Sequence, residues 1–332
     1  MAWFSRPDRS VFAGLDDAVG HRVDVLAHAV GDGVLLAATR EEFALRRGEA
    51  WTVWPWAEVG GGAWKAEAQR FRFRTIDKLE GPPSPAAARG TLVHSVLEHL
   101  FDLPAHERTP EAALALIEPR WAALVGDRPE LGIMLEEDDD LDAPGWFAQA
   151  QSLVERWFDL EDPTRLEPAE RELYVETDLD GLVLRGYVDR LDIAPDGAMR
   201  VVDYKTGRSP GERFEGKALF QMKFYALVLW RSRGEIPRLL QLVYLGDGQV
   251  VRYVPDEHDL RALARNLQAV WAAVERAAHT GDWRPSPSKL CGWCDFQEFC
   301  PEFGGTPPPL PADATRLVLD PRVSGAVAPA DD

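Results

Sequence analysis

The segment GYVDRLDIAPDGAMRVVDYK, residues 186–205, restricts the possible folds more than any other part of this sequence. We predict one strand at residues 182–193 and a second at residues 199–206. Pro195-Asp196-Gly197 lies between them, and these residue types favour a turn. The segment therefore predicts a β-hairpin around which the other elements are arranged.

Charged side chains gather on one face of this hairpin. Successive side chains of a strand point to opposite faces, so Asp203 and Lys205 share a face and Tyr204 takes the other. Asp189 on the partner strand can lie beside them. Two carboxylates with an ammonium between them would form a hard-cation site next to a general base or charge stabiliser. The alternative is a cross-strand ion cluster at the surface, and the hairpin alone does not separate the two.

Four short motifs and a cysteine cluster follow one another along the chain. They are G-x-x-x-H at 90–94, G-x-x-D-R at 186–190, D-Y-K-T-G at 203–207, Q-x-x-x-Y at 221–225 and cysteines at 291–300. From residue 70 to residue 302, this ordered set resembles the RecB-like branch of the PD-(D/E)xK nucleases. The resemblance implies a restriction-endonuclease-like core of α/β (α+β) class. A mixed sheet would be flanked by helices and carry a helical insertion.

The resemblance also implies a metal-dependent active site. His94, Asp189 and Asp203 would hold one or two Mg²⁺ or Mn²⁺ ions, helped by the backbone carbonyl of Tyr204. Lys205 would stabilise the attacking water or the developing negative charge. A lone helical histidine is more often structural than a ligand, and the G-x-x-x-H context favours the ligand.

Further roles follow from the same resemblance. A catalytic glutamate is expected on the first strand of the core, where Glu172 is our choice and Glu176 the alternative. A solvated strand edge remains open for either. Gln221 and Tyr225, one helical turn apart, would orient the site and contact the substrate backbone, and Arg190 would help to position phosphate.

The three cysteines of the chain, Cys291, Cys294 and Cys300, lie within ten residues of one another. This density favours a metal or cluster site over buried structural thiols. The resemblance implies a [4Fe–4S] cluster whose fourth thiolate comes from an N-terminal helix. That thiolate is absent here, where the counterpart segment contains Glu67. A substitute ligand, a labile or lost cluster, and zinc bound by three sulfurs all remain open.

Residues 1–70 differ from the rest and form short strand-like runs separated by turn signals, ending with a run at residues 70–74. We predict a small antiparallel β-module. Its likeness to PH-like domains has low specificity, and a plain β-subdomain with a tryptophan core is favoured over a docking module. The nuclease-like domain would span residues 71–303, and the Pro- and Ala-rich tail at 304–332 is predicted to be disordered.

Other segments show the periodicity of regular elements. Helices are predicted at 90–101, 110–124, 146–160, 218–230 and 259–280, and strands at 170–176, 239–245 and 249–254. The helices between residues 110 and 160 would form the insertion over the active-site face.

Charge and hydropathy limit the function. The net charge of −18 disfavours a general nucleic-acid coat, so any DNA contact must be a focused patch. No apolar run long enough to span a membrane and no signal-like start are seen, which predicts a cytoplasmic protein. The prediction is a metal-dependent DNA exonuclease of repair or recombination, acting on single strands or duplex ends. The alternatives are a non-catalytic DNA-binding or scaffold subunit, and a protein recruited to a partner through its N-terminal module.

Overall fold

The computed structural model describes residues 64–79, 81, 84–137, 142–209, 215–285, 287, 291–292 and 294–319. Its helices are α3 (Trp64–Phe71), α4 (Pro85–Leu100), α5 (Pro110–Ala115), α6 (Ile117–Asp127), α7 (Pro129–Glu137), α8 (Ala143–Leu160), α9 (Glu215–Arg233), α10 (Glu257–Thr280) and α11 (Ala314–Leu319). Its strands are β1 (Glu170–Leu179), β2 (Leu182–Ile193), β3 (Met199–Lys205), β4 (Leu239–Tyr244) and β5 (Gln249–Tyr253). Residues 1–63, which make up most of the predicted β-module, lie outside the described part of the chain. Among the helices described, none is long and apolar enough to cross a membrane.

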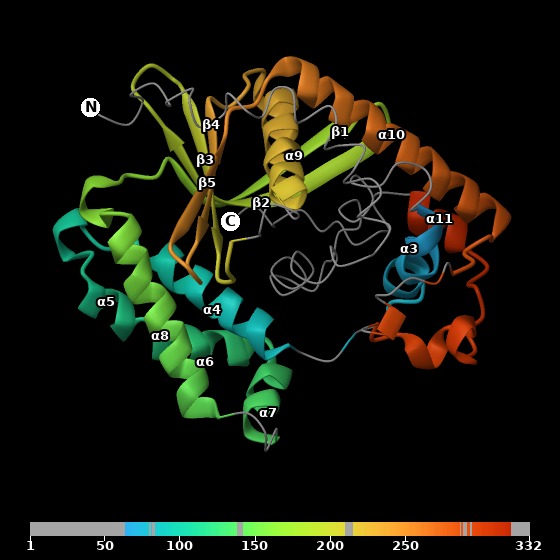
Figure 1. The fold of residues 1–332 in the computed structure, drawn as a ribbon, viewed down its shortest axis with the longest axis horizontal. Coiled ribbons are helices and arrows are strands. Elements are labelled where there is room, and N and C mark those ends of the chain that lie inside the picture. The colour runs from blue at the N-terminus through green and yellow to red at the C-terminus, as the bar shows by residue number, and fades with distance from the viewer. Residues whose placement is uncertain are drawn as a thin grey trace.

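The strands form one mixed sheet in the order β1-β2-β3-β4-β5 (Figure 1). β2 and β3 pair antiparallel and form the predicted hairpin. β3 and β4 pair parallel, so the chain has to cross over between them, and α9 forms this crossover. The mixed sheet with flanking helices confirms the predicted α+β class and the restriction-endonuclease-like core.

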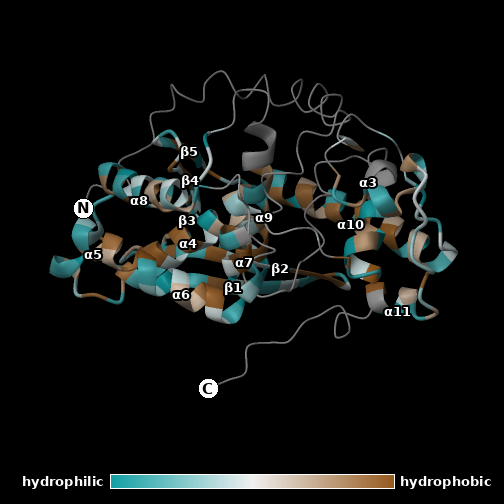
Figure 2. Ribbon diagram, turned by 90° about the horizontal axis from the view of Figure 1, so that it is seen from below, coloured by the Kyte–Doolittle hydropathy of each residue, from teal (hydrophilic) through white to brown (hydrophobic). Residues whose placement is uncertain are grey.

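Helices cover both faces of the sheet. α9 and α10 pack on one face, where Val201 and Leu242 are buried. α4 and the insertion helices α5–α8 pack on the other, where Val202 and Val243 are buried. Neighbouring residues of β3 therefore enter different apolar clusters, as strand alternation requires. α4 is the most enclosed part of the second layer, and much of it is hydrophobic in Figure 2.

A third apolar cluster joins the two ends of the described chain, where α3 and α11 lie beside α10 (Figure 1). Here the predicted strand at residues 70–74 is wrong, because α3 runs to Phe71 and a π-helical turn follows it. The ring of Phe71 stacks on Trp283 with centroids 5.6 Å apart, and Phe73 lies 5.7 Å from Phe296. Both phenylalanines are buried against the C-terminal segment, and helical winding allows this double contact.

The predicted disorder of the tail is also wrong for residues 304–319. Ala314 and Val318 of α11 are buried beside α10. The hydroxyl of Thr315 donates a hydrogen bond to the carbonyl oxygen of Ala278 at 2.9 Å. The prediction rested on the Pro- and Ala-rich composition of the tail. The apolar contacts and this hydrogen bond stabilise an ordered segment despite that composition. Residues 320–332 lie outside the described part of the chain.

Gly246 lies where the β4–β5 turn approaches the loop after β3. Its amide donates to the carbonyl oxygen of Gly207 at 3.0 Å, and an added Cβ would lie 2.4 Å from that oxygen. Because the obstacle is backbone, it cannot rotate away. We expect Gly246→Ala to lower the free energy of unfolding by about 1–3 kcal/mol in urea denaturation.

Gly126→Ala is the matched control for this prediction. Gly126 is exposed in α6, and an added Cβ would meet no atom within 4 Å. Alanine has a better helix propensity than glycine, so this substitution should raise the free energy of unfolding by up to about 1 kcal/mol. Similar effects of both substitutions would mean that the close approach at Gly246 is unimportant.

Candidate active site

Three side chains from three different elements meet near the start of β1. They are His94 from α4, Glu172 from β1 and Asp189 from β2, and one ligand atom of each lies within 4.8 Å of the others. His94 Nδ1 lies 3.4 Å from Asp189 Oδ2, and the histidine side chain is 4 % exposed. An imidazole with two carboxylates is a donor set that suits Mn²⁺ or Mg²⁺, so the predicted metal fits these residues.

α4 holds His94 in a fixed position. Ser84 caps the helix by accepting a hydrogen bond from the amide of Ala87 at 3.3 Å, and Pro85 occupies the first turn. Val93 and Leu97 on this helix are fully enclosed. The imidazole therefore projects from a well-packed helix towards the sheet, where it reaches Asp189.

The backbone of Glu172 adopts a φ of 46°, in the left-handed region that residues other than glycine rarely occupy. The paired residues on either side, Arg171 with Arg190 and Leu173 with Val188, leave Glu172 and Asp189 between them. On β2, Val188 and Leu191 enter the same apolar cluster, although strict alternation would separate them. The strand pair is thus distorted where the two carboxylates come together, and backbone strain of this kind clusters at functional sites.

Glu176, the alternative glutamate, lies away from this group. It is exposed, it accepts a hydrogen bond from the hydroxyl of Tyr174, and it faces Arg185 across the strand pair. Of the two predicted candidates, the geometry therefore favours Glu172.

A second group lies on the α9 face of β3. Lys205 Nζ lies 2.7 Å from Asp203 Oδ2, and the two side chains are 12 % and 3 % exposed. Gln221 Nε2 donates to Asp203 Oδ1 at 2.9 Å and lies 3.4 Å from the hydroxyl of Tyr225. The predicted shared face of Asp203 and Lys205 is present, and the Q-x-x-x-Y motif of α9 lies directly against it. Gln221 and Tyr225 are 2 % and 1 % exposed, which fits the predicted orienting role and not the predicted contact with the substrate backbone.

The main chain of Tyr204 connects the two groups. Its amide N–H donates to Asp189 Oδ2 at 2.7 Å. The backbone pairing of β2 with β3 ends at Arg190 and Val202. Beyond this point the Asp189 carboxylate, and not a backbone carbonyl of β2, accepts the hydrogen bond from the Tyr204 amide. Asp189 consequently lies between His94 and β3. The carbonyl oxygen of Tyr204 stays a predicted metal ligand.

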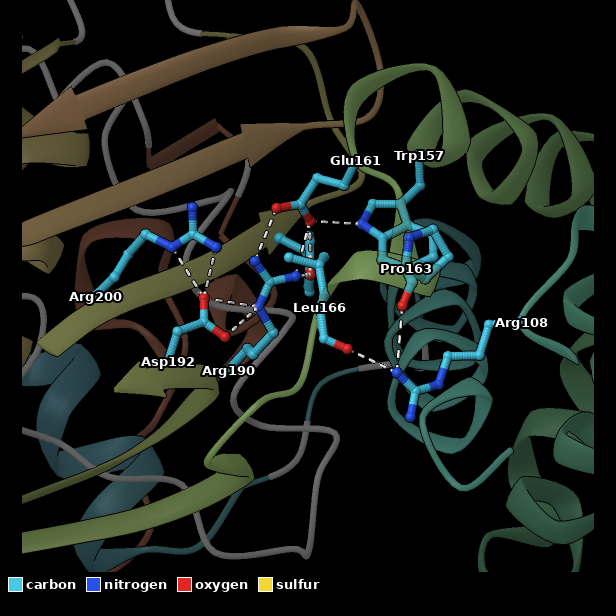
Figure 3. A network of polar contacts seen from close by, with 9 residues as sticks. Arg108, Trp157, Glu161, Pro163, Leu166, Arg190, Asp192 and Arg200 are labelled. Carbon is cyan, nitrogen blue, oxygen red and sulfur yellow. Dashed lines mark hydrogen bonds and ion pairs between the residues drawn. The ribbon is translucent and has the colours of Figure 1, made fainter. Parts of the chain in front are cut away.

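Arg190 does not fit its predicted contact with substrate phosphate. Its side chain is 1 % exposed and its Nη2 lies 2.8 Å from Glu161 Oε1. A second carboxylate, that of Asp192, lies 3.2 Å from Nε. A guanidinium enclosed by two carboxylates has no surface to offer a DNA strand, and we correct its role to a structural one (Figure 3).

Glu161 is the residue that the sequence did not reveal. It follows α8, accepts hydrogen bonds from Trp157 Nε1 and Tyr204 Oη at 2.9 Å each, and pairs with Arg190. Burial favours the neutral acid, but Arg190 and these hydrogen bonds hold the pKa of Glu161 below its usual value. Burial raises the pKa of Tyr204 well above its usual value, so its hydroxyl keeps its proton. No local motif marks Glu161, because all its partners except Trp157 are distant in sequence.

The cysteine segment gives no support to the predicted iron–sulfur cluster. Cys291, Cys294 and Cys300 are half-buried and form no disulfide with one another, and burial with the neighbouring thiols raises the pKa of Cys300. Within the described residues, their sulfur atoms do not form a group lying within 4.8 Å of one another. With three cysteines in the whole chain, a cluster bound by four thiolates does not fit. The side chain of Glu67 lies outside the described part.

Comparison with known sequences identifies curated relatives in two bacteriophages. The chain is 35% identical over 136 residues to the Gene 69 protein of Mycobacterium phage D29, which covers 40% of this chain and 48% of that protein. It is 32% identical over 135 residues to the Gene 69 protein of Mycobacterium phage L5, covering 40% of this chain and 44% of that protein. The alignments thus span about half the length of these relatives.

A solved structure from Eubacterium rectale, provisionally described as an exonuclease, has 16% identity and a TM-score of 0.45. The alignment covers 68% of this chain and 79% of the solved one. A likeness at this level supports no conclusion about function. The sequence profile of the PD-(D/E)XK nuclease superfamily, by contrast, matches residues 68–301. This match covers more than half of the chain and includes both side-chain groups of the candidate site. The chain belongs to the PD-(D/E)XK nuclease superfamily.

Proposed function

We propose that the protein is a metal-dependent DNA exonuclease of the RecB-like type that acts in DNA repair or recombination. The observation that carries the proposal is the meeting of His94, Glu172 and Asp189 next to the Asp203–Lys205 pair. The superfamily supports phosphodiester hydrolysis, and the order of the motifs supports the RecB-like type. A cytoplasmic location would suit this function.

The first group would hold the metal. His94 would bind through a neutral imidazole nitrogen, and Glu172 and Asp189 through carboxylate oxygens. A bound Mg²⁺ or Mn²⁺ ion supplies Lewis-acid polarisation of the phosphate and lowers the pKa of a bound water. Asp203 is turned towards Lys205 in this arrangement, and we infer that it completes the metal site when substrate is present.

The second group would stabilise the negative charge that develops during the reaction. The Lys205 ammonium would stabilise negative charge on the attacking oxygen or the phosphate. Asp203 orients the ammonium through the 2.7 Å contact, and Gln221 orients Asp203 through its other oxygen. The side chains of Asp203 and Gln221 are buried and that of Lys205 is 12 % exposed, so little water competes for these interactions.

The direct test uses wild-type protein with end-labelled single-stranded and blunt duplex DNA. We expect stepwise release of short products from DNA ends with Mn²⁺ or Mg²⁺ and none with EDTA, because the site needs a divalent ion. A closed circular DNA of the same sequence is the control for end dependence.

Each outcome of this assay has a defined meaning. Cleavage of the circle would replace the exonuclease by an endonuclease. Tight DNA binding without cleavage under any metal condition would contradict the enzyme and favour the non-catalytic DNA-binding subunit.

A further inference from the structure

A buried ionic network lies on the face of β3 opposite Asp203 and Lys205. It consists of Glu161 after α8, Arg190 on β2 and Tyr204 on β3. Figure 3 shows Glu161 and Arg190 of this network. We propose that this Glu161–Arg190–Tyr204 network positions the metal-binding carboxylate from behind, and so couples the helical insertion to the active site. The inference rests on the proposed metal site.

The network is built from short and enclosed contacts. Arg190 approaches Glu161 with both terminal nitrogens at 2.8 Å, one to each carboxylate oxygen. The hydroxyl of Tyr204 donates to Glu161 at 2.9 Å and accepts from Arg190. The side chains of Glu161 and Arg190 are 8 % and 1 % exposed. A bidentate pair of this kind holds its geometry because few other orientations satisfy both groups.

The charges of the network balance. Besides Glu161, Arg190 has Asp192 at 3.2 Å, and Asp192 in turn has Arg200 at 2.8 Å. Two guanidinium groups therefore meet two carboxylates in a buried place. Such pairs add little net stability compared with apolar residues, and their use lies more in fixing one arrangement of the elements that carry them.

The network reaches the active site through the backbone. Backbone pairing of β2 with β3 ends at Arg190, and Asp189 is the residue directly before it in the chain. From there the two strands are joined by Tyr204, whose amide holds Asp189 and whose hydroxyl is held by Glu161. A shift of the Tyr204 ring would move the amide and with it the carboxylate beside His94.

Tyr204→Phe is the decisive variant, because it removes one oxygen and keeps the ring and the Glu161–Arg190 pair. We expect the Kd for Mn²⁺ to rise about tenfold, in the range found when a group that holds a metal ligand is lost. The kcat for DNA cleavage should fall by a similar factor, while KM for DNA changes less than twofold, because the ring is buried and has no surface to offer a DNA strand. Isothermal titration with Mn²⁺ gives the first value and steady-state kinetics the others.

Arg108→Met supplies a matched control. Arg108 is 5 % exposed and braces the same insertion by donating hydrogen bonds to the carbonyl oxygens of Leu103, Pro163 and Leu166. Figure 3 shows the bonds to Pro163 and Leu166. Its loss should destabilise the insertion and leave the Kd for Mn²⁺ unchanged. Glu161→Gln serves as a second test, and we expect it to weaken Mn²⁺ binding at least as much as Tyr204→Phe.

Failure of the inference and failure of the proposed function give different results. If the wild type binds and cleaves but folded Tyr204→Phe keeps its Mn²⁺ affinity, the network is structural only. The same conclusion follows if Arg108→Met weakens Mn²⁺ binding as much as Tyr204→Phe, because the effect then follows stability. A wild type that neither binds Mn²⁺ nor cleaves DNA would overturn both.

Discussion

Replacing Lys205 by alanine is expected to lower the rate of DNA cleavage by about 10²–10³-fold, as happens when one group that stabilises transition-state charge is lost. The ammonium lies 2.7 Å from Asp203 Oδ2 in a nearly buried place, so water replaces it poorly. Affinity for DNA should change little, because the side chain is 12 % exposed. Single-turnover cleavage with saturating Mn²⁺ measures the effect.

Lys223→Ala is the matched control for this substitution. Lys223 on α9 also forms an ion pair of 2.7 Å, with Asp259, at 22 % exposure. It lies outside both groups of the candidate site, so its loss should leave the cleavage rate within about twofold. Near-UV circular dichroism of both variants checks the fold. Full activity of folded Lys205→Ala would remove this lysine from the mechanism.

Local chemistry made the centre of this fold predictable. Alternating side chains and a Pro-Asp-Gly turn specify the hairpin without distant partners, and β2 has the predicted bounds. The shared face of Asp203 and Lys205 follows from strand geometry alone. His94 and Gln221 required the order of the motifs, because nothing local distinguishes them from ordinary helical residues.

Contacts between residues distant in sequence determine the features that the sequence did not predict. Asp189 and Arg190 are neighbours in one motif, yet Asp189 joins His94 and Glu172 while Arg190 is enclosed beside Glu161. The alternation of side chains along β2 breaks at Asp189 and Arg190, where the pairing with β1 is distorted. The sequence of β2 alone does not predict this break. Likewise, Phe71 and Phe73 predicted a strand, whereas in the helical segment they pack on Trp283 and Phe296, which are distant in sequence.

Glu172→Gly is expected to change stability and metal binding in opposite directions. Glycine accepts the φ of 46° without the strain of a side chain, and the substitution also removes one of two carboxylates that face each other. The free energy of unfolding in EDTA should rise by about 1 kcal/mol, the order of the cost of a left-handed residue. The Kd for Mn²⁺ should rise by more than about 100-fold, beyond the usual cost of losing a group that only supports a ligand.

Two further variants separate strain from charge in this prediction. Glu172→Gln keeps the strained backbone and the side-chain shape, so it should lose Mn²⁺ affinity as Glu172→Gly does without the gain from relieved strain. Lys78→Gly relieves a similar φ of 54° at an exposed position outside both groups of the candidate site, and should gain stability with no change in Mn²⁺ affinity. Urea denaturation in EDTA and Mn²⁺ titration measure both quantities. If Glu172→Gly bound Mn²⁺ as tightly as the wild type, the left-handed backbone at Glu172 would serve the strand pair and not the metal site.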